Sequence, residues 1–322
     1  MNELKNSTVL ITGATGTIGS ALAQALFAAN EKDALNIKIL AFGRDEQKAK
    51  MLIEKNGVAF YKHDICEPFV LAENVDYIFH CAAVTKSAEM VSNPVDVAAT
   101  SVFGTRNVLE MARAKQVKSL VYLSSMEVYG QGIDGEVTEK DLGHLDLTNL
   151  RSCYPESKRF CETLCNAYYA QYGVPVKLAR LAQTFGAGVP KDDTRVFAQF
   201  AKSVIAGNDI VLHTDGKSRG NYCCITDAVN ALFILLLKGE NGQAYNIANP
   251  AASMTVREMA ELVAGKFGVE VQVEIPANPQ KLGYAPNSGY ILNIDKITQL
   301  GWKPKYGLAE MYEQLVSSWQ VV

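Results

Sequence analysis

The stretch Gly13-Ala14-Thr15-Gly16-Thr17-Ile18-Gly19 decides the fold of this 322-residue chain. It follows an apolar, β-branched run at residues 8–12 and opens an amphipathic helical pattern at residues 18–29. In that context Gly13 allows a tight turn, Gly16 lets a pyrophosphate approach the backbone, and Gly19 lets the helix pack closely on the strand. The free N–H groups and the positive dipole end of the helix favour phosphate groups. The stretch therefore predicts a dinucleotide-binding site.

Strand and helix patterns alternate through the first half of the chain. After the glycine stretch, β-branched runs predict further strands at residues 38–42, 58–62, 77–81, 120–124 and 176–180. Amphipathic patterns predict helices at residues 45–55, 95–114 and 155–172. Alternation at this spacing is typical of a doubly wound α/β fold, in which helices cover both faces of a parallel sheet.

Glycine and proline break this regularity after residue 181. Helices are expected at residues 226–237, with Thr226 as the N-cap, and at residues 256–267. A strand at residues 271–275, a loop rich in Pro, Asn and Gly, and two short helices after Asp295 complete the chain. We expect a nucleotide-binding domain at residues 1–182 plus about 224–250. A smaller substrate-binding domain is expected at about 183–223 plus 251–322.

Composition argues against several classes of partner. The 31 basic and 34 acidic side chains give a net charge of −3 without a basic stripe, so we expect no nucleic-acid partner. The longest apolar run, residues 231–237, falls far short of the ~20 residues of a membrane span. The 7 cysteines, with no export signal, favour reduced thiols and a cytoplasmic location. The 4 histidines form no metal-binding pair, and we expect no metal site.

Tyr154 and Lys158 form a Tyr-x-x-x-Lys pair at the start of a predicted helix, and Ser125 stands upstream at the end of a predicted strand. Residues at positions i and i+4 share one face of a helix, so the Lys158 ammonium can lie near the phenol and lower its pKa. A phenol poised in this way is a general base or acid for a sugar hydroxyl during hydride transfer.

With these motifs the chain resembles the extended short-chain dehydrogenase/reductase family, which contains the NAD-dependent nucleotide-sugar epimerases, dehydratases and decarboxylases. The resemblance covers the whole chain and includes His80-Cys81-Ala82-Ala83, Asn93-Pro94 and Gly104-Thr105-Arg106-Asn107. It implies a Rossmann fold with a smaller C-terminal α/β domain, and a homodimer formed through the helices at residues 95–114 and 155–172. It also implies that Ser125 binds the reacting oxygen, Tyr154 exchanges its proton and Lys158 binds the nicotinamide ribose.

The cofactor site takes residues from several strand ends. The expected contacts are Gly13, Thr15, Gly16, Thr17, Ile18, Gly19, Arg44, Asp64, Ile65, Cys81, Ala82, Ala83, Thr100, Tyr154 and Lys158. Arg44 stands where NAD-dependent enzymes carry an acidic residue, so it can pair with a 2′-phosphate and favour NADP over NAD. Alternatively, Arg44 is a solvated residue before a helix that Asp45 caps. Asp64 is placed either to bind the adenine amino group or to cap a turn.

The residues after Ser125 bear on the reaction. In the 4,6-dehydratases that the chain resembles, an Asp and a Glu at this point eliminate water, whereas the decarboxylases keep only the glutamate. This chain has Met126 and then Glu127, and the stretch from Arg151 to Arg159 is also similar to the UDP-glucuronate decarboxylases. Glu127 is a candidate catalytic residue if the segment stays extended and points it to the side of Ser125. The alternative is an ion pair of Glu127 with Arg180 or Lys86.

The expected substrate contacts are Thr85, Lys86, Ser125, Gln183, Arg195 and Arg219. Two of them depart from the decarboxylases. Gln183 replaces an asparagine that contacts the nucleotide diphosphate, and Arg219 lies one place before the usual arginine position, which here is Gly220. Arg219 can therefore bind a sugar diphosphate rather than a glucuronate carboxylate.

These observations support three hypotheses. The first is an enzyme that oxidises a nucleotide-linked sugar, usually at C4, with bound NAD or NADP, and then decarboxylates or epimerises it. The second is a reductase that consumes NADPH on a keto-sugar or another small carbonyl compound, which suits Arg44. The third is a cofactor-sensing regulator, which would be expected to lose the Ser125–Tyr154–Lys158 triad that this chain retains.

Overall fold

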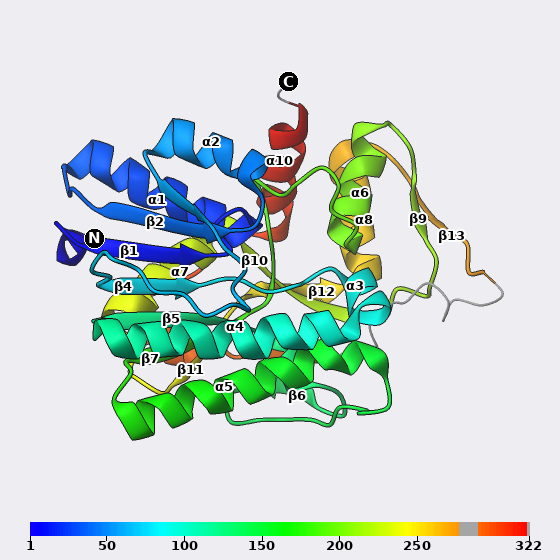
Figure 1. Ribbon diagram of the computed structural model, residues 1–322. Coiled ribbons are helices and arrows are strands. Elements are labelled where there is room, and N and C mark those ends of the chain that lie inside the picture. Colours follow the sequence, from blue (N-terminus) through cyan, green and yellow to red (C-terminus); the bar gives the residue numbers. More distant parts are fainter. Residues whose placement is uncertain (277–288, 321–322) are drawn as a thin grey trace.

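A seven-stranded parallel sheet lies at the centre of the computed structural model, which describes residues 1–276 and 289–320 (Figure 1). Its order is β3-β2-β1-β4-β5-β7-β11. The strands are β1 (Thr8–Thr12), β2 (Lys38–Gly43), β3 (Ala59–Lys62), β4 (Tyr77–His80), β5 (Ser119–Ser125), β7 (Val176–Leu181) and β11 (Ala244–Ile247). The strand order reverses between β1 and β4, and crevices for ligands form at the carboxyl ends of strands at such a point.

Alternating apolar residues explain why this sheet is covered on both faces. Val9 and Ile11 of β1 pack toward one face, and Leu10 packs toward the other. The first face lies under α1 (Thr17–Asp33), α2 (Glu46–Asn56) and α7 (Ile225–Lys238). The second lies under α4 (Pro94–Lys115) and α5 (Cys153–Tyr172), which lie side by side (Figure 1). The predicted doubly wound α/β class is confirmed.

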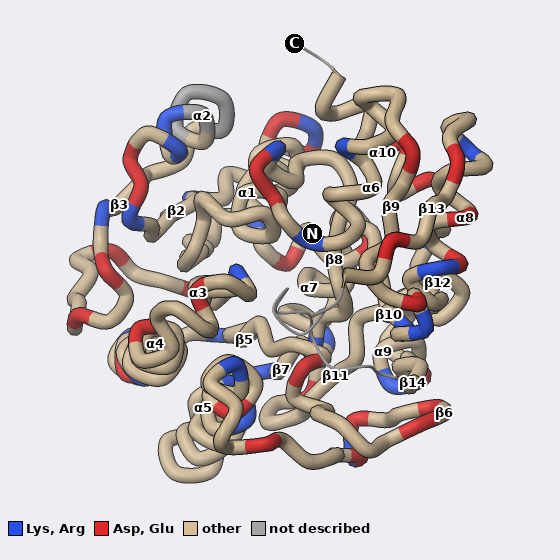
Figure 2. Tube along the Cα trace, turned by 90° about the vertical axis from the view of Figure 1, so that its right-hand side faces the viewer, with Lys and Arg blue, Asp and Glu red and all other residues tan. Residues whose placement is uncertain are grey.

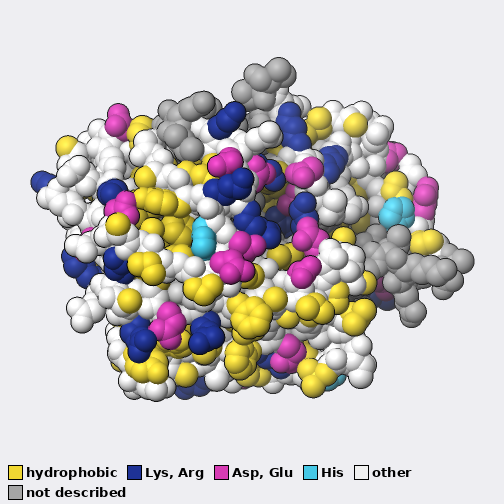
Figure 3. Space-filling model, viewed as in Figure 1, with side chains coloured by type: hydrophobic (Ala, Val, Ile, Leu, Met, Phe, Trp, Pro, Cys, Tyr) yellow, Lys and Arg dark blue, Asp and Glu magenta, His cyan; other side chains and the backbone are white. Residues whose placement is uncertain are grey.

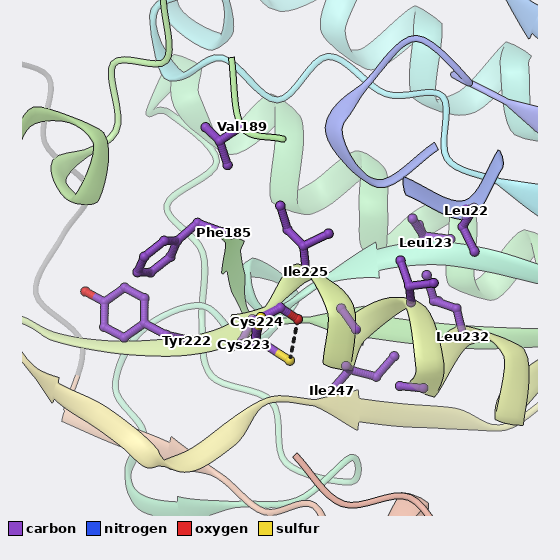
Figure 4. Close-up of a cluster of buried hydrophobic side chains, with 14 of the residues drawn as sticks. Leu22, Leu123, Phe185, Val189, Tyr222, Cys223, Cys224, Ile225, Leu232 and Ile247 are labelled. Carbon is purple, nitrogen blue, oxygen red and sulfur yellow. Dashed lines mark hydrogen bonds between the residues drawn. The ribbon is translucent and has the colours of Figure 1, made fainter. Parts of the chain in front are cut away.

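The helix α7 carries much of the core on the first face. Ile225 and Leu232 of α7 lie near Leu123 of β5, Leu22 of α1 and Ile247 of β11 (Figure 4). All five side chains are buried, and burying a Leu or Ile side chain contributes roughly 1.5–3 kcal/mol relative to its exposure. This packing fixes the last strand of the sheet against strands that are more than a hundred residues earlier in the chain.

Short strands and helices build the rest of the molecule. A three-stranded sheet joins β8 (Gln183–Phe185), β10 (Arg219–Cys224) and β12 (Asn249–Thr255), and two-stranded sheets join β6 (Asp134–Val137) with β14 (Gly289–Leu292) and β9 (Ile210–Leu212) with β13 (Val271–Val273). The helices here are α3 (Ser87–Ser92), α6 (Val196–Ile205), α8 (Val256–Phe267), α9 (Asp295–Thr298) and α10 (Leu308–Gln320). Three 3-10 turns are η1 (Asn2–Leu4), η2 (Met126–Tyr129) and η3 (Leu150–Ser152).

Three expectations for this part need correction. The helix α7 begins at Ile225 with Cys224 as its N-cap, not Thr226, because β10 runs directly into it. The strand predicted at residues 271–275 ends at Val273. The strands β6, β8, β9, β10, β11, β12 and β14 were not predicted. Most of the loop expected to be rich in Pro, Asn and Gly lies outside the described residues.

Charged residues of both signs are spread over the chain (Figure 2). No helix among the described residues is long and apolar enough to cross a membrane. Within the same residues, no three or more His, Cys, Asp or Glu side chains are grouped as metal ligands. All seven cysteines are free thiols.

Candidate active site

The glycine loop between β1 and α1 is too crowded for side chains. Gly13 has a φ of +65°, and a Cβ there would lie 2.8 Å from the backbone N and Cα atoms of Ala82. A Cβ on Gly19 would lie 2.8 Å from the Cα of Ala14, where real Cβ atoms essentially never come. The Gly16 N–H donates to the Gly13 carbonyl at 3.0 Å, and Gly16 is the N-cap of α1. The loop thus brings bare backbone to a helix N-terminus, which fits the pyrophosphate of a dinucleotide.

Buried hydrogen bonds join the ends of β1 and β4 beside this loop. Thr12 Oγ1 accepts from the Ala82 N–H at 3.3 Å and lies 2.7 Å from Nδ1 of His80. The other ring nitrogen of His80 lies 3.2 Å from Thr105 Oγ1 on α4. Burial lowers the pKa of His80 to about 3, so its imidazole is neutral at physiological pH. The arrangement fixes the backbone at Cys81 and Ala82, two of the predicted cofactor contacts.

The segment after β3 is fixed to α4. The Asn107 side chain donates to the carbonyls of Ile65 and Cys66 at 3.0 and 2.8 Å. A Cβ on Gly104 would come within 2.8 Å of the Ile65 side chain, so α4 packs closely here. The predicted cofactor residues Asp64 and Ile65 therefore occupy a defined position, with Thr100 of α4 close to Cys66.

Arg44 follows β2, and its side chain is 67% exposed. Its guanidinium lies 4.0 Å from the Asp64 carboxylate, and Asp45 caps α2 by accepting from the Lys48 N–H at 3.0 Å. An exposed ion pair at this distance contributes little to stability. Arg44 is thus open to a ligand, and both interpretations of this residue stand.

Ser125, Tyr154 and Lys158 come together at the carboxyl end of β5. Ser125 is the last residue of that strand, and Tyr154 lies in the first turn of α5, where its phenol is close enough to the Ser125 hydroxyl for that group to lower the phenol's pKa. The Lys158 ammonium donates to the Leu123 carbonyl at 2.7 Å and lies 5.9 Å from the centre of the Tyr154 ring. A hydroxyl and a lysine thus flank the phenol.

The expected lowering of the Tyr154 pKa by Lys158 is wrong for this structure. Burial raises the pKa of the phenol above its usual value, and the Glu127 carboxylate raises it further. The Ser125 hydroxyl and the charges of Arg151 and Arg195 act in the opposite direction. Burial also lowers the pKa of Lys158 to about 8. The phenol is therefore protonated in this structure and is suited first to donating a hydrogen bond.

The segment after Ser125 is not extended as expected. It turns into η2, and Ser125 Oγ caps this turn by accepting from the Glu127 N–H at 3.2 Å. Both oxygens of Glu127 accept hydrogen bonds from Arg151, at 2.7 and 2.9 Å. The suggested ion-pair partners were wrong: Glu127 pairs with Arg151, and Arg180 instead binds Glu162.

The predicted substrate residues occupy different surroundings. Gln183 is on β8, and Arg195 is the N-cap of α6, where it donates to Asp193 at 2.6 Å and stacks over Phe197. Arg219 donates to the Ser253 carbonyl at 2.9 Å and lies 3.8 Å from Glu258. Thr85 and Lys86 are exposed residues before α3. Of these, Arg195 and Ser125 lie near enough to Tyr154 to lower the pKa of its phenol.

An arginine at position 220 would not fit in this structure. A Cβ on Gly220 would collide with the ring of Tyr222, its neighbour on the same face of β10. Tyr222 is buried and packs edge-on against Phe185. The offset of Arg219 is therefore built into the packing of β10.

Comparison with known proteins identifies the family to which a chain with this site belongs. Residues 9–248 match the NAD dependent epimerase/dehydratase family. UDP-glucuronic acid decarboxylase 6 of Arabidopsis thaliana is 30% identical over 309 residues, which cover 95% of this chain and 86% of the relative. The chain belongs to the NAD dependent epimerase/dehydratase family. This is a family of NAD-dependent enzymes that modify nucleotide sugars.

Solved structures share the fold of this chain. The UDP-glucose 4-epimerase of Thermotoga maritima, solved with UDP-glucose, superimposes with a TM-score of 0.84 at 22% identity, over 97% of this chain and 98% of that one. The UDP-glucuronic acid 4-epimerase of Bacillus cereus, solved with NAD, gives 0.80 at 20% identity, over 97% and 96%. The predicted family and fold are confirmed.

Two residues at the site of this epimerase/dehydratase were not predicted to act there. Arg151, three residues before Tyr154, holds the Glu127 carboxylate. Tyr290 of β14 donates to the Met126 carbonyl at 3.1 Å and so braces the same turn. Arg151 begins the stretch that is similar to the decarboxylases, but no sequence pattern indicates its pairing with Glu127, 24 positions earlier. Nothing in the sequence indicated Tyr290.

Proposed function

We propose that this enzyme oxidises a nucleotide-linked sugar at C4 with bound NAD or NADP and then decarboxylates it, with epimerisation as the alternative outcome. The observation that carries the proposal is the meeting of Ser125, Tyr154 and Lys158 at the carboxyl edge of the sheet, beside the glycine loop. The resemblance to UDP-glucuronic acid decarboxylases over 95% of the chain supports this choice of reaction.

The chain's own groups serve the proton transfers. A bound NAD or NADP would supply the hydride acceptor for the sugar carbon. The Tyr154 phenol would first release its own proton to solvent and then, as the phenolate, take the hydroxyl proton of that carbon, while Ser125 would donate a hydrogen bond to the same oxygen. Lys158 is held by the Leu123 carbonyl with its ammonium near the phenol, so it can bind a ribose hydroxyl. The charges of Arg151 and Arg195 favour the deprotonated phenol. The resulting 4-keto sugar is a β-keto acid if it carries a C5 carboxylate, and it can then lose carbon dioxide.

The residues after Ser125 support decarboxylation over dehydration. Met126 offers no proton donor at the position of the dehydratase aspartate, while Glu127 is present near the phenol. Glu127 can accept a proton next to the ketone or steer a departing carboxylate. The diphosphate and the sugar are proposed to contact Thr85, Lys86, Gln183, Arg195 and Arg219.

The cofactor contacts follow the loop and the strand ends described above. We propose NADP as the preferred form, because the Arg44 guanidinium is exposed beside Asp64 and can reach a 2′-phosphate. This feature also favours the second candidate function, an NADPH-dependent reductase of a keto-sugar or another small carbonyl compound. Asp64 and Ile65 would hold the adenine.

A homodimer through α4 and α5 is part of the proposal. Hydrophobic side chains gather over these two helices (Figure 3), and Phe103 and Phe160 are each 53% exposed. Burying such aromatic side chains between two copies is favourable. We also propose a cytoplasmic location, which suits the free thiols, and the two-domain division at residues 1–182 plus about 224–250 and 183–223 plus 251–322.

The test is a panel of nucleotide sugars incubated with the enzyme and NAD or NADP, with products read by mass. We expect a nucleotide-linked uronic acid to lose carbon dioxide. Conversion without a change in mass would replace decarboxylation by epimerisation. A gain of two hydrogens with consumption of NADPH would establish the reductase, and conversion of no nucleotide sugar would refute the proposal.

A further inference from the structure

Two of the arginine–glutamate pairs near the active site differ in how completely they are hydrogen-bonded. Arg180 donates to Glu162 through Nε and one terminal nitrogen, and its other terminal nitrogen donates to the Tyr129 hydroxyl at 3.1 Å and the Glu139 carbonyl at 2.9 Å. Every nitrogen of this guanidinium is used. Such a fully satisfied pair is what a structural brace requires.

The pair of Arg151 and Glu127 is incomplete by comparison. The two terminal nitrogens of Arg151 hold the two oxygens of Glu127, but Nε is buried and has no hydrogen-bond partner among the described residues. The Arg151 side chain is only 14% exposed. Leaving a buried donor unpaired costs roughly 1–3 kcal/mol, so a brace built for stability alone is a poor explanation of this arrangement.

The turn that carries Glu127 is already held without Arg151. Arg159 of α5 donates to the carbonyl of Val128 at 2.7 Å, and Tyr290 donates to that of Met126 at 3.1 Å. The backbone of η2 is therefore fixed from two sides, whereas the Glu127 carboxylate is held by Arg151. Arg151 acts on the orientation of the carboxylate rather than on the fold of the turn.

We propose that Arg151 is a positioning residue that fixes the orientation of the Glu127 carboxylate and balances its charge beside the Tyr154 phenol. This inference rests on the proposed function of Glu127 at the substrate. The other groups around the phenol are Arg195 before α6, Lys158 on α5 and the Tyr122 hydroxyl on β5. Arg151, unlike these groups, donates two hydrogen bonds to Glu127. Its positive charge therefore offsets the negative charge that Glu127 places near the phenol.

Variants of this pair separate orientation from charge. Arg151→Gln removes the charge and the paired donors, whereas Arg151→Lys keeps the charge without the planar fork. Arg151→Gln combined with Glu127→Gln removes both charges. Arg113→Gln is the matched control, because it breaks an arginine–glutamate contact of 2.8 Å in the last turn of α4, distant from η3.

The first measurement is the pH profile of kcat and KM with the converted nucleotide sugar. In Arg151→Gln we expect kcat to fall at least tenfold and the ascending limb to move up by about one pH unit, since an unbalanced Glu127 disfavours the phenolate. Arg151→Lys should keep the limb in place with a smaller loss of kcat. The double variant should bring the limb back to the wild-type position or below it. A lower Tm in Arg151→Gln with an unchanged limb and kcat would overturn the proposal.

The second measurement needs no substrate. Crystal structures of the wild type and Arg151→Gln should show the Glu127 carboxylate turned away from its original orientation in the variant, while η2 keeps its backbone. A carboxylate that stays in place without Arg151 would overturn the inference. Failure of the proposed function is distinguishable, because the wild type would then convert no nucleotide sugar. The crystal structures would still test whether Arg151 orients the Glu127 carboxylate.

Discussion

At the amino edge of the seven-stranded sheet, the charged side chains of Lys177 and Asp76 have hydrogen-bond partners within the protein, whereas at the carboxyl edge two buried polar atoms do not. Lys177 donates to Ser119 at 2.7 Å at the amino edge, and Asp76 accepts from the Thr8 N–H at 2.8 Å. At the carboxyl edge, Ser124 Oγ and Arg151 Nε are buried without a hydrogen-bond partner among the described residues. Buried polar groups in native proteins are nearly always paired, so the exceptions call for an explanation.

This difference bears on which edge of the sheet binds ligands. Parallel strands bring all their carboxyl ends to one edge, and the glycine loop, Ser125 and Tyr154 all lie there. Unpaired buried atoms alone do not mark the edge, since Asn241 Oδ1, just before β11, also lacks a partner among the described residues. The carboxyl edge combines such atoms with the glycine loop and the N-terminus of α1, and this combination supports the proposal that cofactor and substrate bind there.

The largest effect is expected from removing one hydroxyl at the carboxyl edge. Tyr154→Phe should lower kcat by ~10²–10⁴-fold, because the phenol exchanges the sugar proton, while cofactor affinity stays within a few-fold. The measurement is steady-state turnover together with a cofactor titration. Activity above about a tenth of wild type would remove Tyr154 from the proposed triad.

Tyr168→Phe is the matched control for that prediction. Tyr168 lies on the same helix, about 21 Å farther along its axis at 1.5 Å per residue, and donates to Glu110 at 2.6 Å. Its loss should lower stability slightly and leave kcat near that of the wild type. An equal loss of activity in both variants would mean that the helix, rather than the Tyr154 hydroxyl, is responsible.

Two glycines sharpen the comparison through stability. Gly13→Ala should destabilise the protein by about 2–5 kcal/mol, because the positive φ is strained and the Cβ would lie 2.8 Å from Ala82 backbone atoms. Gly57 ends α2 just before the amino end of β3, with a φ of +55° and nothing within 4 Å of an added Cβ. Gly57→Ala should therefore cost only the strain, and denaturant unfolding of both variants measures the difference. Equal losses would show that crowding at the glycine loop is unimportant.

Arg44, at the carboxyl edge, is predicted to affect the choice between NAD and NADP. Arg44→Ala should weaken NADP by about 1.5–3 kcal/mol and leave NAD nearly unchanged, if its guanidinium pairs with the 2′-phosphate. Lys38→Ala is the control, since Lys38 begins the same strand at the amino edge and lies 3.5 Å from Glu73. Binding titrations with both cofactors provide the readout. Equal effects on NAD and NADP, or none, would make Arg44 a solvated residue before a helix.

The sequence predicted the first half of the chain better than the second. Strands such as β1 and β5 are apolar and regularly spaced, so their pattern was sufficient. The strand β8 has only three residues, and β10 and β12 contain Gly, Asn, Pro and Ser, which disfavour strands. Pairing with distant partners holds these segments in place. No local pattern could show that.

The site follows the same division. Tyr154 and Lys158 were predictable because their spacing is local, and Ser125 because it ends a regular strand. The turn at η2 and the pairing of Glu127 with Arg151 depend on how α5 and η3 pack against β5, and alternation along a strand therefore gave the wrong geometry for Glu127.

The smallest predicted effect concerns Lys177 at the amino edge. Burial lowers the pKa of Lys177 to about 8 from an ordinary value of 10.5. In the window between these two values the unfolded chain holds a proton that the folded protein has released, so the free-energy cost of burying this residue falls as pH rises. Lys177→Met removes the effect. Relative to this variant, the wild type should gain about 1.4 kcal/mol between pH 7 and pH 9. Urea unfolding of both proteins at each pH measures that gain, and contributions of the shared cysteines cancel in the difference.

Lys118→Met serves as the control, since the hydrogen bond with Asp76 raises the pKa of Lys118. The difference in unfolding free energy between this variant and the wild type should stay flat over this range. A flat difference for Lys177→Met as well would show that Lys177 keeps its proton, and that the amino edge buries a charge that its hydrogen bonds to Ser119 and Pro175 fully accommodate.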